Sequence, residues 1–140
     1  MIFWDSSGLI PLLVAQNESE YCIQALSRDR EILTWCLTRV EIASALSRRR
    51  REGGLKPEQH QRVKKRLQLL MESAYQVTAL EKTKSRALRL LEVHPLRAAD
   101  ACQLAAALVA SQEDPERLAM ICFDQRLKHA AMLEGFVVNP

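Results

Sequence analysis

The chain has 140 residues and a formal net charge of +3 at pH 7, with 48% hydrophobic and 26% charged residues. A chain of this length and composition buries enough surface to fold as one domain without disulfides or a structural metal, which excludes disordered and fibrous proteins. No apolar run approaches the ~20 residues of a membrane span, and the N-terminus lacks the features of a signal peptide, so a cytoplasmic protein with no membrane partner is expected.

Short apolar runs alternate with helical patterns along the whole chain. In chain order, the predicted elements are a strand at 2–5, a helix from about 9, a helix from 17 or 19 to 28, a strand at 31–35, helices at 38–52 and 57–75, a strand at 76–80, helices at 81–93 and 98–111, a strand at 118–123, a helix at 125–133 and a strand at 136–138. This alternation predicts one three-layer α/β/α domain over residues 1–140, with a central parallel sheet of four to five strands.

Individual residues mark where the predicted helices begin and end. Pro11 is expected in the first turn of the first helix, where proline is tolerated. Asn17 or Ser19 is expected to cap the second helix. Asp124 is the predicted N-cap of the last helix, which Gly135 ends.

Four acidic residues fall where strands end or helices begin. Asp5 and Asp124 end the first and fourth strands, while Glu41 and Asp100 lie in the first turns of helices. In an open parallel sheet the functional crevice lies beyond the carboxyl ends of the strands, so these side chains are expected along one edge. For any one of them, stabilisation by a helix N-terminus is an equally good explanation, but for all four together that explanation is weaker.

Four carboxylates in one cleft would repel each other and raise each other's pKa unless a cation lay among them. Oxygen ligands suit Mg²⁺ or Mn²⁺, which can assist the hydrolysis of a phosphodiester bond. We therefore predict Asp5, Glu41, Asp100 and Asp124 as metal ligands and catalytic residues. Ser6 is the fifth candidate, because its hydroxyl could bond a metal-bound water or an Asp carboxylate, although capping the following helix is an equally good role.

Positive charge is concentrated in the middle of the chain. Between Arg39 and Arg66 there are ten Lys and Arg residues against three acidic ones, and they include the run Arg48, Arg49, Arg50 and Arg51. Such a block suits contact with a phosphate backbone, so this run is the predicted nucleic-acid-binding segment. It could instead bind an acidic stretch of a partner, or keep a hairpin of helices soluble.

The cysteines and histidines give no sign of a second site. Cys22, Cys36, Cys102 and Cys122 form no C-x-x-C pair, so they are expected as buried reduced thiols. His60 is expected on a polar helix face, and no histidine lies opposite an evident nucleophile.

Five segments together resemble the PIN-domain family, and most of all the toxin of a VapBC-type bacterial toxin-antitoxin pair. They are residues 2–10 with Asp-Ser-Ser after a strand, 38–46 with a helical Glu, 96–105 with an Asp that begins a small-residue helix, 121–127 with Asp-x-Arg, and the tail 135–140. Each segment is short, but their order and spacing over nearly the whole chain make the resemblance specific.

The resemblance implies a ribonuclease that acts on single-stranded or looped RNA, with Asp5, Glu41, Asp100 and Asp124 around one or two divalent metal ions. It also implies a homodimer and a small antitoxin partner that covers the active site. The departures leave the acidic residues intact: Ser6 stands where Thr is common, and Cys102 and Gln103 stand where Leu and His are frequent.

Two other functions stay open. A catalytically idle PIN-like module would bind RNA or a protein through Arg48 to Arg51 and would not be stabilised by metal. A phosphatase acting through an aspartyl intermediate would need a second Asp two residues after the nucleophile, where this chain has Ser7. The apolar surfaces of the helices up to Arg28 and from Pro57 to Tyr75 could also include a dimer interface.

Overall fold

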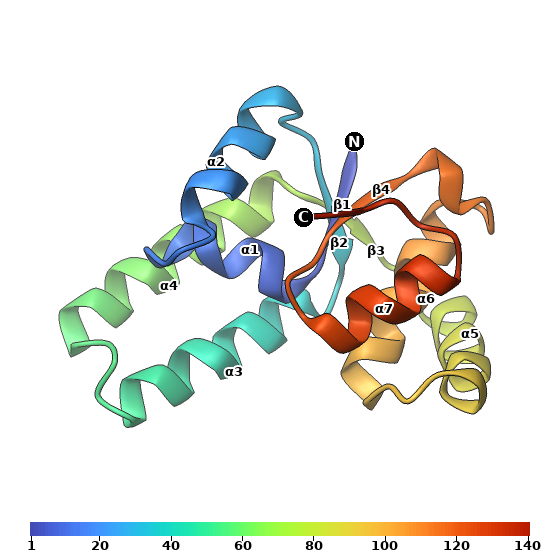
Figure 1. The fold of residues 1–140 in the computed structure, drawn as a ribbon. Coiled ribbons are helices and arrows are strands. Elements are labelled where there is room, and N and C mark those ends of the chain that lie inside the picture. The colour runs from blue at the N-terminus through green and yellow to red at the C-terminus, as the bar shows by residue number, and fades with distance from the viewer.

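Five parallel strands form the central sheet, in the order β3-β2-β1-β4-β5 (Figure 1). The structure is a computed structural model that describes residues 1–140. The strands are β1 (Ile2–Trp4), β2 (Ile32–Trp35), β3 (Tyr75–Val77), β4 (Ala119–Ile121) and β5 (Val138–Asn139). This arrangement confirms the predicted α/β class with its parallel sheet, although β5 begins two residues later than predicted.

Side chains alternate across the sheet, so each strand supplies both of its faces. Phe3 and Met120, which are partners in the β1–β4 register, point into one core, while Trp4 and Ile121 point into the other. All four are essentially inaccessible to solvent. Burial on both faces explains why these strands are continuously apolar in sequence.

The second half of the chain covers one face, on the right of Figure 1. It comprises α5 (Leu80–Val93), α6 (Ala98–Ala110), the short 3₁₀ helix η1 (Pro115–Arg117) and α7 (Gln125–Leu133). Four alanines of α6, Ala101, Ala105, Ala106 and Ala107, are fully buried in this core.

The first half covers the other face, on the left of Figure 1. It comprises α1 (Ser6–Leu13), α2 (Ser19–Arg28), α3 (Thr38–Arg51) and α4 (Pro57–Ser73). Helices α3 and α4 form a long hairpin, and Gly53 adopts the left-handed conformation, with φ of 81°, in the turn between them. Glycine adopts this conformation without strain, and the turn at Gly53 separates the two helices.

Two details of the predicted helix starts are wrong. Asp5 caps α1, so the helix begins at Ser6, and Pro11 lies inside it rather than in its first turn. The N-cap of α2 is Glu18 and makes no side-chain cap bond. The Ser19 hydroxyl instead donates to the Pro11 carbonyl at 2.7 Å, because the chain folds back here onto the end of α1.

His60 and the cysteines also differ in burial from what was expected. His60 is only 7% exposed and lies between α3 and α4, because the hairpin covers the helix face predicted to be polar. All four cysteines are free, and Cys22 and Cys122 are buried, but Cys36 and Cys102 are half-buried. None of the helices is long and apolar enough to cross a lipid bilayer.

Candidate active site

The four predicted acidic residues all lie at the carboxyl edge of the sheet or at helix N-termini. Asp5 follows β1 directly, and Asp124 follows β4 after two residues. Glu41 and Asp100 occupy the first turns of α3 and α6. The strand order turns back between β1 and β4, and the crevice at such a switch point is where open parallel sheets bind ligands.

Asp5 is buried, with 2% of its surface exposed, and its carboxylate is held by the backbone that follows it. Oδ1 accepts from Ser7 Oγ at 2.8 Å and from Gly8 N at 3.0 Å, and Oδ2 accepts from Ser7 N at 3.1 Å. Burial raises the pKa of Asp5 to about 6, because the hydrogen bonds from Ser7 and Gly8 only partly offset the loss of hydration, and the charge of Glu41 adds to the rise.

Ser7 joins the two strand ends that carry Asp5 and Asp124. Its hydroxyl donates to Asp5 Oδ1 and accepts from Phe123 N at 2.8 Å and from Asp124 N at 3.2 Å. The sequence interpretation considered Ser6 for such a role and did not assign Ser7. Ser6 is the first helical residue, and its side chain lies close enough to Glu41 to lower the pKa of that carboxyl.

Gly8 allows α1 to start directly against β4. A Cβ at this position would lie 2.8 Å from the Ile121 carbonyl oxygen and 2.9 Å from Ile121 Cγ2. Real Cβ atoms essentially never lie this close to another heavy atom, so any side chain here would separate the Asp5 turn from the end of β4. The glycine therefore permits the close approach that places Asp5 beside the end of the strand leading to Asp124.

Glu41 is positioned by a polar network that reaches back to β1. Gln103 Nε2 donates to Glu41 Oε2 at 3.0 Å and to Thr38 Oγ1 at 2.9 Å. The Thr38 hydroxyl lies 2.9 Å from that of Thr34, which donates to the Trp4 carbonyl at 2.7 Å. Sequence reasoning noted Gln103 only as a departure from the resembled family and missed both threonines.

The pKa of Glu41 is raised, mainly because the side chain is removed from water. Hydrogen bonds from Gln103 and Ser6 lower this pKa, and the charge of Asp100 raises it again. Glu41 thus lies close enough to both Asp5 and Asp100 for its negative charge to repel theirs.

Asp100 and Asp124 both stabilise helix N-termini. Asp100 Oδ2 accepts from Arg97 N at 3.1 Å, and Asp124 Oδ1 accepts from Arg126 N and Leu127 N at 3.0 and 2.9 Å. The N-cap predicted at Asp124 is confirmed. In each residue the other carboxylate oxygen makes no hydrogen bond within the protein, so capping leaves one oxygen of each free to bind a ligand.

No Lys, Arg or His lies within ion-pair distance of any of the four acids. Their donor chemistry suits a hard cation such as Mg²⁺ or Mn²⁺. No group of three or more Asp, Glu, His or Cys side chains, however, is arranged to hold a metal ion. The donors therefore fit an ion that takes one or two carboxylates and keeps several waters, and not a closed protein cage.

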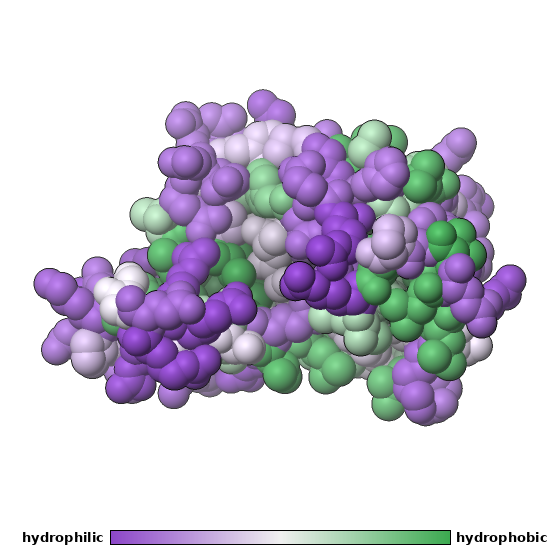
Figure 2. Space-filling model, turned by 60° about the horizontal axis from the view of Figure 1, so that its bottom comes forward, coloured by the Kyte–Doolittle hydropathy of each residue, from purple (hydrophilic) through white to green (hydrophobic).

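The predicted arginine run forms the last turn of α3. Arg48, Arg50 and Arg51 are exposed, whereas Arg49 is half-buried. Figure 2 shows a strongly hydrophilic surface over this end of the α3–α4 hairpin, at the left, and hydrophobic side chains over α5, at the right. The run therefore lies on the same half of the molecule as Asp5 and Glu41.

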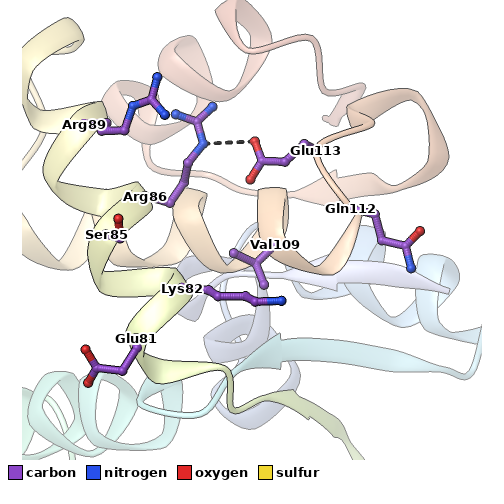
Figure 3. Close-up of a pocket in the computed structure, with 8 residues that line it drawn as sticks. All are labelled: Glu81, Lys82, Ser85, Arg86, Arg89, Val109, Gln112 and Glu113. Atoms are coloured by element: carbon purple, nitrogen blue, oxygen red, sulfur yellow. Dashed lines mark hydrogen bonds and ion pairs between the residues drawn. The ribbon is translucent and has the colours of Figure 1, made fainter.

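The largest pocket, of about 620 Å³, contains none of the predicted site residues (Figure 3). It lies between α5 and the end of α6, where the Arg86 guanidinium reaches across to Glu113 at 3.0 Å and to Glu134 at 3.3 Å. Glu134 is also 2.6 Å from His94 Nε2. An ion-pair network thus joins α5, the turn after α6 and the end of α7 in this region.

The comparisons with known proteins gave one match. The sequence profile described as "PIN domain" matches residues 2–133, which span all four acids and every helix. No curated protein matches the sequence.

Proposed function

The chain belongs to the PIN domain family, and from this membership we propose that it is a Mg²⁺- or Mn²⁺-dependent endoribonuclease that hydrolyses phosphodiester bonds of RNA. PIN domains are typically nucleases and generally use divalent metal ions. The observation that carries the proposal is that four carboxylates lie at strand ends or helix N-termini, with Asp5 and Asp124 flanking the β1–β4 switch point, and that none of the four has a Lys, Arg or His within ion-pair distance. Such a set costs folding free energy unless a ligand balances its charge.

The proposed metal ligands are drawn from Asp5, Glu41, Asp100 and Asp124. When bound, the ion would polarise a phosphoryl oxygen, help to deprotonate a water and offset charge on the leaving oxygen. The chain itself fixes the carboxylates, since Ser7 orients Asp5 and Gln103 orients Glu41. Burial raises the pKa of Asp5 and of Glu41, so each holds a proton more firmly than an ordinary carboxylate and is a better base.

RNA is the proposed substrate, with Arg48 to Arg51 as its binding segment. Arginine presents planar, always charged donors that match phosphate oxygens, and the exposed members of the run are free to meet them. The contact would be independent of base sequence, so the run supplies affinity and leaves the choice of RNA to other residues.

We further propose that the chain is the toxin of a type II pair with a small antitoxin. A groove of about 240 Å³ between α1 and α4 offers a place for a segment of that partner. Its floor contains Leu13, Val14, Leu55 and Val63, and Arg62 and Arg66 line it as well. An apolar segment with acidic flanks fits this chemistry, and reversing the charge of both arginines should weaken inhibition by the partner without changing RNA cleavage.

A homodimer is proposed on the apolar surface of α5. Leu88 is 67% exposed and Val93 70%, and Leu80 and Leu91 are exposed on the same helix. The helices that the sequence suggested as parts of a dimer interface each expose fewer large apolar side chains, namely Tyr21 and Ile23 on α2 and Leu69 on α4. A dimeric mass in light scattering, reduced to that of the monomer by Leu88→Asp, would support this interface.

A catalytically idle binding module is the second candidate. It is favoured by the capping roles of Asp5, Asp100 and Asp124 and by the lack of any group of three ligand side chains. Titration with Mn²⁺ separates the two functions. A nuclease site predicts a rise in melting temperature, corresponding to about 2.7 kcal/mol at 100 times the Kd, whereas the idle module predicts none.

Cleavage of a labelled RNA containing single-stranded and looped segments tests the proposal directly. We expect cleavage with Mg²⁺ or Mn²⁺, none in EDTA, and a loss of roughly 100-fold or more in Asp100→Asn, equivalent to about 2.7 kcal/mol. Asp114→Asn is the matched control, because Asp114 pairs with Arg117 on the surface and should leave cleavage unchanged. Full activity of Asp100→Asn in a clean preparation would refute the proposal.

A further inference from the structure

Arg49 differs from the three arginines beside it. Successive residues of a helix point about 100° apart, so the members of the run face different directions. Only Arg49 is half-buried, and its Nη2 donates to Gln16 Oε1 at 3.1 Å. This bond holds the side chain against the turn between α1 and α2, while Arg48, Arg50 and Arg51 stay in solvent.

The Arg49 side chain lines a pocket that includes part of the acidic site. The pocket has a volume of about 200 Å³, and its lining contains both Ser7 and Asp124. Arg49 is the one cationic residue in that lining. The pocket therefore runs from the Ser7 bridge between β1 and β4 to the end of α3.

Arg49 forms no ion pair within the protein, although Glu18 and Asp124 line the same pocket. Its bound partner is the neutral amide of Gln16, whose own Nε2 is turned to Glu18 Oε2 at 3.0 Å. No carboxylate lies within ion-pair distance of the guanidinium. Four of its five N–H donors thus remain for an anion, and the Gln16 bond limits the conformational entropy lost when that anion binds.

We propose that Arg49 binds a phosphate of the RNA next to the one that is cut, and so sets the register of the substrate in the acidic site. This inference rests on the proposed ribonuclease function. A phosphate is favoured over an acidic side chain of a protein, because an RNA strand passing the acidic site carries further phosphates into the adjoining pocket, where Arg49 is the one positive charge. Arg48, Arg50 and Arg51 add only general attraction.

The test compares Arg49→Ala with Arg50→Ala, a matched loss of one charge from the same helical turn. Under single-turnover conditions we expect kcat/KM to fall about tenfold or more for Arg49→Ala and about twofold or less for Arg50→Ala. Arg49→Lys should recover only part of the loss, because lysine retains the charge without the planar fork. Gln16→Met keeps the charge of Arg49 but removes the hydrogen bond that holds its side chain, so we expect an intermediate loss of kcat/KM.

Binding is measured separately in an Asp100→Asn background, by fluorescence anisotropy over a series of salt concentrations. Arg49→Ala should reduce the slope of log K against log salt by about 0.7, the value for one phosphate contact on a single strand. A merely structural role would leave this slope unchanged.

The outcomes distinguish this inference from the proposed function. No cleavage by the unsubstituted chain overturns both. Cleavage by the unsubstituted chain with equal, small losses in Arg49→Ala and Arg50→Ala overturns the role of Arg49 alone. Unchanged RNA binding together with lost inhibition by a protein partner also overturns it, and assigns Arg49 to an acidic side chain of that partner.

Discussion

Two charged regions of this molecule are built in opposite ways. In the region around the α5 pocket every carboxylate has a cation: Glu113 and Glu134 meet Arg86, Glu134 also meets His94, and Glu81 meets Lys84. At the carboxyl edge of the sheet Asp5, Glu41, Asp100 and Asp124 have none, although Asp5 is the most buried of all these acids.

We interpret this difference as one between charge that serves the fold and charge that the proposed function requires. A buried carboxylate loses hydration, and a cation or several hydrogen bonds must offset that loss. The chain uses cations for this around Glu134 but only backbone N–H groups, hydroxyls and an amide around Asp5 and Glu41. The second solution leaves the negative charge in place, which is what binding a divalent cation requires.

The comparison is tested most strongly by Asp5→Asn. Cleavage should fall by roughly 100-fold or more, since the variant removes a proposed metal ligand, equivalent to about 2.7 kcal/mol or more. Thermal stability at pH 8 should be unchanged or higher, because asparagine also caps helices and removes a buried charge. A large fall in melting temperature would show that Asp5 serves the fold, as Glu134 does.

The pH dependence of stability gives the next largest effect. The pKa of Asp5 is about 6 in the folded protein against an ordinary value of 3.8, so near pH 5 the folded chain holds a proton that the unfolded chain has released. Stability is therefore fully present below about pH 4 and is lost as the pH rises through 6, by about 3 kcal/mol at most.

Urea denaturation in EDTA at a series of pH values measures this slope. The Asp5→Asn variant should show a smaller slope, and the difference between the two proteins isolates the contribution of Asp5 from that of Glu41, whose pKa is also raised. A free energy of unfolding that rises with pH over the same window, and equally in both proteins, would contradict the assignment.

Glu134→Gln probes the paired region. Removing the charge weakens the bonds to Arg86 and His94, both of which are mostly buried, so we expect a loss of about 1–3 kcal/mol in the free energy of unfolding. RNA cleavage at a temperature where the variant is folded should be unchanged. A fall in cleavage comparable to that of Asp5→Asn would remove the distinction between the two regions.

The smallest effect is expected for Glu81→Gln. Glu81 is 82% exposed and pairs with Lys84 one turn away, so the pair is worth about 0.5 kcal/mol or less. Denaturation in low and in high salt should show the difference disappearing as the charges are screened.

Much of this architecture is predictable because local patterns determine it. The glycine pair that follows Glu52, the proline at the first position of α4 and the Asp before α7 each fix a helix boundary within a few residues. Asp5 directly follows one apolar strand and Asp124 comes two residues after another, so their position at the same edge follows from the parallel sheet.

Contacts between distant segments could not be predicted in this way. Ser7 bonds the backbone 116 and 117 residues further along the chain, and Gln103 reaches Glu41 across 62 residues. Periodicity tells which face of an element is buried but not which neighbour covers it. Ser6 was therefore chosen over Ser7 as the hydroxyl of the site, and His60 was expected on a polar helix face. The distinct role proposed for Arg49 likewise depends on a turn that lies 33 residues earlier.

The two helical layers contribute equally to the acidic site, since Asp5 and Glu41 belong to helices of the first half and Asp100 and Asp124 to helices of the second. During synthesis the residues up to 51 emerge well before those from 98 onward, so a nascent or truncated copy holds only half of the acidic side chains. Any chemistry that needs both pairs begins only when the last helix has docked, so the proposed nuclease would be active only as a completed chain.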